Sequence, residues 1–253
     1  MPAVIAGSDS AGSDGLVTQK GTCILARPMM NRITRPEAVV FDFDGTIGDT
    51  RSLIIACFQG TYAELGLPAP EESAIAATIG LPLESAFRQL SGFDPPDSAK
   101  ASTTYRELFR GLDFREVKPF EGMPELVAGC RSRGFPIAVA SSRGHATLDP
   151  MLQSLGLMEH LSLVVDHEDA GTEKPDPEML HIAARAFGID SRRLVMIGDT
   201  RFDIQMGKNA GSATIGVTWG NHSAEELAAL APDLLAENPG QINDFLCFER
   251  AGL

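Results

Sequence analysis

Two carboxylates stand two residues apart in the stretch Asp42-Phe43-Asp44-Gly45-Thr46, at the end of a short apolar run. If this run is a strand, Asp42 lies at its carboxyl end and Asp44 turns toward the same space, since Gly45 permits a sharp change of direction. Two acids in this position can take two catalytic roles, one as the nucleophile and the other as a general acid or base. For the pair alone, a solvated acidic turn is an equally good interpretation.

A second acidic pair follows another apolar run, in Met196-Ile197-Gly198-Asp199-Thr200, with Asp203 four residues after Asp199. Four residues are about one helical turn, so the two side chains can face the same way. Acids gathered at one edge of a sheet repel each other unless a cation lies among them. Oxygen ligands of this kind are those that Mg²⁺ prefers. The pair therefore predicts a magnesium site, and we also expect Asp199 to cap the helix that follows.

Two side chains suited to phosphate stand between these acidic pairs. Ser141 directly follows the apolar run 137–140 and can donate its hydroxyl to a phosphate oxygen. Lys174 lies in Lys174-Pro175-Asp176-Pro177, where the prolines restrict the backbone. Taken singly, the serine is typical of a turn and the lysine of a surface. An acid pair, a hydroxyl, a lysine and an acid pair, each after one of four successive predicted strands, favour one shared site.

The elements that must position these residues are strands alternating with helices. Apolar runs typical of buried parallel strands occupy residues 38–42, 137–140, 163–165, 194–197 and 213–217. Helical stripes around Leu126, Leu148 and Leu180 lie between them and end near glycines. Closing helical and strand elements are expected over 227–235 and 242–246. The pattern predicts an α/β fold with a Rossmann-like parallel sheet covered on both faces.

Residues 51–120 break this alternation, because they show helical stripes around Phe58, Phe87 and Tyr105 and no convincing strand. We expect an inserted helical cap over the carboxyl ends of the strands, where parallel sheets bind their ligands. The predicted organisation is an α/β core of residues 36–50 and 121–253, with residues 51–120 as the cap. Residues 1–35 are expected to form a flexible extension, and Met29 or Met30 are alternative starts of translation.

Charge and composition limit the partners of this chain. Its 253 residues include 34 acidic and 21 basic side chains, a formal net charge of −13. Nucleic acid is therefore excluded as an expected partner, and an anionic substrate must be attracted by a local metal or lysine. No apolar run is long enough to span a bilayer, and no secretory signal is evident. The four cysteines show no disulfide or metal spacing, so we expect a reduced, cytoplasmic protein.

Together these segments resemble the motifs of the haloacid dehalogenase superfamily, in its phosphoglycolate-phosphatase-like branch with a helical cap. Residues 41–50 resemble the first motif, Ser141 the second, Lys174-Pro175-Asp176-Pro177 the third and residues 198–203 the fourth. The likeness runs from about Glu37 to the C-terminus.

The resemblance implies a Mg²⁺-dependent phosphatase that hydrolyses a small phosphate monoester, such as phosphoglycolate or a sugar phosphate, through an aspartyl-phosphate. Asp42 would be the nucleophile, and Asp44 would serve first as acid and then as base. The metal would bind the side chains of Asp42 and Asp199 and the backbone carbonyl of Asp44. Asp203 would order the surroundings of the metal or pair with Lys174.

The resemblance also implies contacts to the substrate. Ser141, Lys174 and Thr46 would hold the phosphoryl oxygens. Ser142-Arg143-Gly144 departs from the Asn-Lys that relatives often have after the serine, and Gly48 replaces a larger apolar residue. Ser142, Arg143 and, from the cap, Arg88 are candidates for contacts to the rest of the substrate, although a plain surface position is the better interpretation of Arg88.

Other activities on the same scaffold remain open. A sugar-phosphate mutase similar to β-phosphoglucomutase would use Asp42 and Asp44 in the same way and return the phosphoryl group to another position of the substrate. A dehalogenase is disfavoured because that chemistry does not need Asp44. A non-catalytic binding relative would have lost motif residues, and all are present here. The sequence specifies neither the natural substrate nor the oligomeric state.

Overall fold

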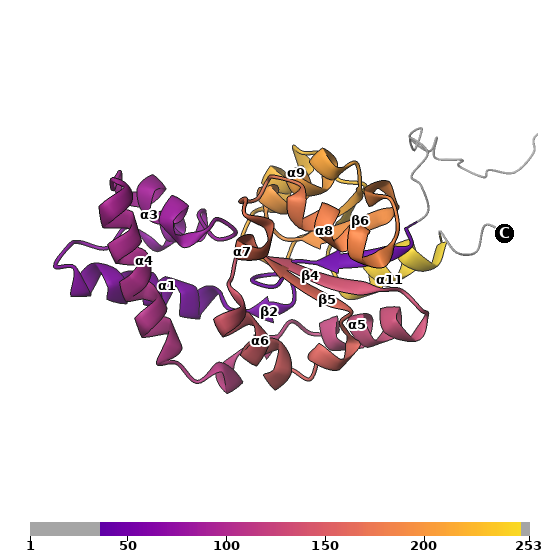
Figure 1. Ribbon diagram of the computed structural model, residues 1–253, viewed down its shortest axis with the longest axis horizontal. Coiled ribbons are helices and arrows are strands. Elements are labelled where there is room, and N and C mark those ends of the chain that lie inside the picture. The colour runs from indigo at the N-terminus through magenta and orange to yellow at the C-terminus, as the bar shows by residue number, and fades with distance from the viewer. Residues whose placement is uncertain (1–35, 249–253) are drawn as a thin grey trace, which may run out of the picture. The chain divides into compact units, whose positions relative to one another are not determined.

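The computed structural model describes residues 36–248, so the predicted extension over residues 1–35 lies outside the described part. A six-stranded sheet in the order β5-β4-β1-β6-β7-β8 forms the centre of the fold, and every neighbouring pair is parallel (Figure 1). The strands, in this order, are Leu163–Asp166, Ile137–Ser141, Ala38–Phe41, Leu194–Gly198, Ala213–Val217 and Leu234–Ala236. The predicted α/β fold is confirmed.

The central strands β4, β1, β6 and β7 are buried along their whole length because helices cover both faces of the sheet. All four residues of β1 are fully buried, and alternate side chains enter different clusters. Val39 and Phe41 pack with residues of α5 (Met123–Ser132), α6 (His145–Ser154) and α11 (Pro239–Phe248). Ala38 and Val40 pack with α8 (Glu178–Phe187) and α9 (Arg201–Ala210). In Figure 1, α5 and α11 accordingly lie across the sheet from α8 and α9.

Two short helices complete this part of the fold. Helix α7 (His167–Ala170) follows β5 directly, and α10 (Ala224–Ala228) lies between β7 and β8. No helix within residues 36–248 is long and apolar enough to cross a membrane.

Four helices lie between two short strands, β2 (Gly48–Asp49) and β3 (Lys118–Pro119), which pair antiparallel. These helices are α1 (Arg51–Glu64), α2 (Glu72–Ala76), α3 (Leu83–Ser91) and α4 (Pro95–Arg110). The expectation that residues 51–120 contain no strand is therefore wrong at their C-terminal end. The division of the chain into a cap and a core stays a prediction.

The stretch 94–97 has the composition of a loop, and in the structure it forms the N-cap and first turn of α4. The Asp94 side chain accepts a hydrogen bond from the Asp97 backbone N–H at 3.0 Å and caps the helix. Pro95 and Pro96 occupy the first turn, where a missing N–H costs no intrahelical hydrogen bond. The prolines thus fix where α4 begins.

Candidate active site

A buried lysine joins the ends of two segments that are far apart in the sequence. Asp42 directly follows β1, and its Oδ1 accepts a hydrogen bond from Lys174 Nζ at 2.6 Å. Lys174, in the connection between α7 and α8, also donates to Oδ1 of Asp203 in the first turn of α9, at 2.7 Å. None of the three residues is more than 4% exposed. The predicted nucleophile, lysine and second acid therefore form one network.

Burial controls the protonation of this network. It raises the pKa of Asp42 well above its ordinary value; Lys174 lowers that pKa in part, and the charges of Asp203 and Asp199 raise it further. It also raises the pKa of Asp199 to about 7, again with Asp203 acting in the same direction. Burial alone would lower the pKa of Lys174, but Asp203 and Asp42 outweigh it and leave that pKa raised. One lysine cannot neutralise three carboxylates, so the network favours a further cation.

Asp199 directly follows β6 and is held from two sides. Its Oδ1 accepts from Thr46 Oγ1 at 3.0 Å, and its Oδ2 accepts from the backbone N and Nδ2 of Asn221 at 2.7 and 2.9 Å. Asn221 Nδ2 also lies 3.4 Å from the Asp44 carbonyl oxygen. The Asp44 carbonyl and the Asp199 carboxylate, two of the predicted metal ligands, are therefore neighbours.

The expected helix-capping role of Asp199 is wrong, because Thr200 caps α9. Asp203 completes the cap: its Oδ2 accepts hydrogen bonds from Thr200 N and Oγ1 at 3.0 and 2.6 Å. Asp199 therefore does not cap α9, and it lies with Asp42 and Asp203 in the strand-end network, the group of buried charges around Lys174. Gly220 is required beside it, since a Cβ there would lie 2.2 Å from the Cβ of Asp199.

The oxygens at this strand edge fit a divalent metal ion. Carboxylate oxygens of Asp42, Asp199 and Asp203 lie within 4.8 Å of one another, and all three residues are buried. Both oxygens of Asp203 are already used by Lys174 and Thr200. The oxygens of Asp199 likewise accept hydrogen bonds, from Thr46 and Asn221. Asp42, Asp199 and the Asp44 carbonyl stay the predicted ligand set, and hard oxygen donors of this type are those that Mg²⁺ prefers.

The Asp44 side chain is paired with Arg143, a contact that the sequence did not reveal. Arg143 donates from Nη2 to Oδ1 at 2.8 Å and from Nε to Oδ2 at 2.9 Å, and Thr50 Oγ1 donates to Oδ1 at 2.6 Å. The arginine side chain is only 8% exposed, and its guanidinium lies 4.3 Å above the ring centre of Phe109 in α4. An acid engaged in this way accepts hydrogen bonds and has no proton to donate.

A cavity of about 270 Å³ opens beside these groups. Asp42, Asp44 and Ser141 line it from the strand ends, and the helices α1, α3 and α4 line it from the opposite side. Ser141 Oγ accepts from the Arg143 backbone N–H at 3.1 Å, and Ser142 Oγ donates to the Gly80 carbonyl at 2.6 Å. The volume is suited to a small molecule.

Three of the predicted substrate contacts, Lys174, Thr46 and Arg88, do not line the cavity. Thr46 donates its hydroxyl to Asp199 and does not line the cavity. Arg88 is exposed on α3, donates to Ser85 at 3.0 Å and also lies outside the cavity lining.

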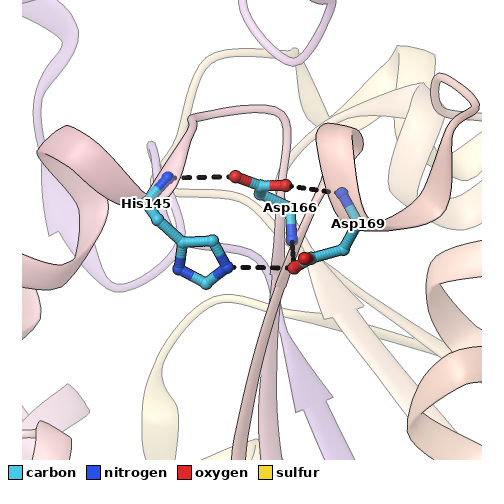
Figure 2. Close-up of side chains that lie close together, drawn as sticks. All are labelled: His145, Asp166 and Asp169. Atoms are coloured by element: carbon cyan, nitrogen blue, oxygen red, sulfur yellow. Dashed lines mark hydrogen bonds and ion pairs between the residues drawn. The ribbon is translucent and has the colours of Figure 1, made fainter.

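The cavity wall also contains His145. Its Nε2 lies 2.9 Å from Asp169, and its backbone N–H donates to Asp166 (Figure 2). Its Nδ1 lies 3.0 Å from Asp149. The hydrogen bond to Asp149, opposed by partial burial and assisted by Asp169, raises the pKa of His145 to about 9. The ring is therefore an imidazolium at neutral pH, with both nitrogens occupied.

Comparison with known proteins identifies the family. The model of the family described as haloacid dehalogenase-like hydrolase matches residues 39–217, which is more than half of the chain. The chain belongs to the haloacid dehalogenase-like hydrolases. It is 36% identical to the probable phosphatase IndB of Dickeya dadantii over 81% of its own length and 90% of that protein. It is 30% identical to the pyrophosphatase PpaX of Bacillus velezensis, over 80% of the chain and 93% of that protein.

Further relatives agree with this assignment. An N-acetylmuramic acid 6-phosphate phosphatase of Pseudomonas aeruginosa is 29% identical, over 84% of the chain and 95% of that protein. The fold also matches a haloacid dehalogenase-like family protein of Streptococcus pneumoniae with a TM-score of 0.73 and 24% identity, over 84% of the chain and 99% of that structure. Family membership and these relatives together support a phosphatase enzyme that acts on small phosphorylated compounds.

Proposed function

We propose that the chain is a Mg²⁺-dependent phosphatase that hydrolyses a small phosphate monoester through an aspartyl-phosphate at Asp42. The observation that supports this most directly is the contact of Lys174 with Asp42 and Asp203 beside a cavity of about 270 Å³. The relatives are named for N-acetylmuramic acid 6-phosphate, pyrophosphate and nucleotides, so their names favour a phosphorylated small molecule without selecting one.

The transferring phosphoryl group would lie between Asp42 and Ser141. The Ser141 hydroxyl, which already accepts from the Arg143 backbone, has its own proton to donate to a phosphoryl oxygen. Lys174 orients the Asp42 carboxylate and supplies a positive charge beside the reacting phosphorus. Mg²⁺ held by Asp42, Asp199 and the Asp44 carbonyl would neutralise negative charge on the phosphoryl oxygens.

In the first step, a carboxylate oxygen of Asp42 forms a bond to phosphorus, and the bond from phosphorus to the substrate alcohol breaks. The leaving oxygen takes a proton from Asp44. In the second step, a water attacks phosphorus and gives its proton to Asp44, and the bond to Asp42 breaks. Inorganic phosphate leaves and the Asp42 carboxylate is regenerated.

The acid role of Asp44 requires a change at Arg143. In the structure Asp44 is a carboxylate paired with that guanidinium, whereas the first step needs a protonated Asp44. We infer that substrate binding opens the contact, so that the Asp44 side chain can reach the leaving oxygen. The stacking of Arg143 on Phe109 connects this event to helix α4.

The test of this function is the substitution Asp42→Asn. We expect phosphate release to fall by about 10⁴-fold or more, because removal of a nucleophile leaves only binding and charge stabilisation. Asp113→Asn, an exposed acid paired with Arg115, is the matched control and is expected to keep full activity. Wild-type turnover by Asp42→Asn, with its fold intact by circular dichroism, would rule out the nucleophile assignment.

A further inference from the structure

Helix α4 presents two arginines to the cavity, and neither is paired with an acid within residues 36–248. Arg106 and Arg110 both line the cavity, and no ion pair or hydrogen bond joins either guanidinium to another group within residues 36–248. Arg106 is partly buried and Arg110 is exposed. The two are four residues apart on one helix, so their side chains emerge from the same face, one turn from each other.

The other cations of the cavity and its strand-end network already have partners. Arg143 pairs with Asp44, and Lys174 pairs with Asp42 and Asp203. His145 lies between Asp149 and Asp169, the latter contact being visible in Figure 2. Two like charges one helical turn apart repel each other, and this repulsion is relieved when an anion binds between them. In a chain with a formal net charge of −13, such a pair is also a local attraction for an anionic ligand.

The position of the pair relative to Asp44 determines which part of a substrate it would meet. Arg110 directly follows Phe109, on whose ring Arg143 lies, and Arg143 holds Asp44. Arg106 directly follows Tyr105, which stacks on Phe109 with ring centres 5.7 Å apart. Asp44 is the proposed proton donor to the leaving oxygen, so the leaving group begins beside Asp44. Asp44 and the two arginines line the same cavity.

We propose that Arg106 and Arg110 bind a second anionic group, a carboxylate or a second phosphate, on the leaving part of the substrate. This inference rests on the proposed phosphatase function and deepens it. The enzyme would then prefer phosphate esters of acidic alcohols over esters of neutral alcohols of the same size. Guanidinium groups suit this task, because they form two parallel hydrogen bonds with carboxylate or phosphate oxygens.

The experiment compares pairs of substrates that differ only in the second anion. The pair phosphoglycerate and glycerol phosphate tests a carboxylate near the phosphate. The pair phosphogluconate and glucitol phosphate tests a carboxylate far from it. Fructose bisphosphate against fructose monophosphate tests a second phosphate, and p-nitrophenyl phosphate reports the basal chemistry. Each is measured with the wild type, with Arg106→Gln/Arg110→Gln, and with Arg106→Lys/Arg110→Lys. Lys100→Gln removes an exposed charge from the same helix outside the cavity lining and serves as the control.

We expect the wild type to favour the anionic member of at least one pair by about tenfold or more in kcat/KM, as expected for one charge-assisted contact. The pair that shows this preference identifies the anion. In the glutamine double variant the preference should disappear while p-nitrophenyl phosphate hydrolysis stays within about threefold of wild type. The lysine double variant should retain part of the preference, and Lys100→Gln should retain all of it.

Other outcomes overturn the inference. The first is a wild type that prefers the anionic substrate in none of the pairs. The second is a glutamine double variant whose kcat/KM falls equally for the anionic and the neutral substrate of a pair. The third is a Lys100→Gln variant that loses the preference as the glutamine double variant does. If the wild type hydrolyses p-nitrophenyl phosphate but shows no preference, the second-anion site is wrong and the phosphatase function stands. If it releases phosphate from no ester, including p-nitrophenyl phosphate, the proposed function fails together with the inference.

Discussion

The strand-end site and the helices α1 to α4 are held together by opposite kinds of interaction. At the strand ends, Asp42 and Asp203 share Lys174, and Asp199 lies buried beside them. Between α1, α3 and α4 the buried side chains include five aromatic rings. Phe58 lies 4.8 Å from Phe87 and 5.1 Å from Tyr105, measured between ring centres.

These two kinds of interaction contribute differently to the stability and to the chemistry of this enzyme. Crowded buried carboxylates oppose folding, since each has lost its hydration and meets charges of the same sign. Buried rings favour folding through the apolar surface that they remove from water. Substitutions at the strand ends should therefore affect activity most, whereas substitutions among the rings should affect stability most.

The largest effect is expected for Lys174→Met, which removes the only cation of the strand-end network. We expect activity to fall by about 10³-fold or more. The free energy of unfolding without metal should fall by about 3 to 5 kcal/mol, because Asp42 and Asp203 are left as unpaired buried charges. Steady-state kinetics and urea denaturation in EDTA measure the two effects. Arg185→Met, which removes an exposed ion pair with Glu178, is the control. Near-wild-type activity of Lys174→Met would contradict the network.

The ring cluster is tested by Phe87→Ala. This side chain is fully buried against other rings, and we expect a loss of about 3 to 5 kcal/mol in the free energy of unfolding. The folded variant should keep kcat within about tenfold, because no ring of the cluster reacts. Leu67→Ala, at a side chain that is 42% exposed, should change stability by less than about 0.5 kcal/mol. A fall in kcat of well over tenfold in fully folded Phe87→Ala would contradict the assignment of the rings to stability and of the strand ends to activity.

Arg143 contacts both regions, since it pairs with Asp44 and stacks on Phe109 of α4. The substitution Asp44→Asn tests the acid role of its partner. We expect a loss of about 10² to 10³-fold with alkyl phosphates, which need a proton on the leaving oxygen. The loss with p-nitrophenyl phosphate should be clearly smaller, because its leaving group needs little protonation. Equal losses with both kinds of ester would count against an acid role of Asp44.

The smallest expected effect is a pH-dependent loss of stability when His145 is replaced. Its pKa in the folded chain is about 9, above the ordinary value of 6.5, because of its hydrogen bond to Asp149 and, with burial opposing, that to Asp169. The stability from these contacts is therefore fully present below about pH 6.5 and lost as pH rises through about 9. The side chain is 41% exposed, so solvent limits the contribution to about 1 kcal/mol or less.

His145→Gln should accordingly lower the thermal midpoint by a few degrees at pH 6 and leave it unchanged at pH 10. Thermal unfolding followed by circular dichroism at both pH values measures this. An equal shift at pH 6 and pH 10 would show that packing, and not the charge of the imidazolium, is lost in the variant.

The sheet and the residues at its strand ends could be predicted because one simple pattern encodes both. Each central strand is a buried apolar run, and Asp42 and Asp199 each directly follow such a run. Helix α2 was missed because Glu72–Ala76 is too short to show a helical period. The start of α4 could not be predicted because the adjacent prolines at its first turn have the composition of a loop.

The contacts between distant segments could not be predicted. Arg143 reaches Asp44 across 99 residues of sequence, and Asn221 reaches Asp199 across 22. Such pairings depend on how two loops and a helix pack together, and a single sequence contains no direct signal for that. A polar residue after β7, at the same edge as Asp42 and Asp199, was the only available hint for Asn221.

The most direct test of the account is chemical trapping of the aspartyl-phosphate. The enzyme is mixed with a phosphate ester and Mg²⁺, quenched in acid and reduced with borohydride, which converts an acyl phosphate into an alcohol. We predict that mass spectrometry finds homoserine at position 42 and an unchanged aspartate at positions 44, 199 and 203. Reduction at another of these residues, or at none of them while phosphate is being released, would contradict the assignment of Asp42 as the nucleophile.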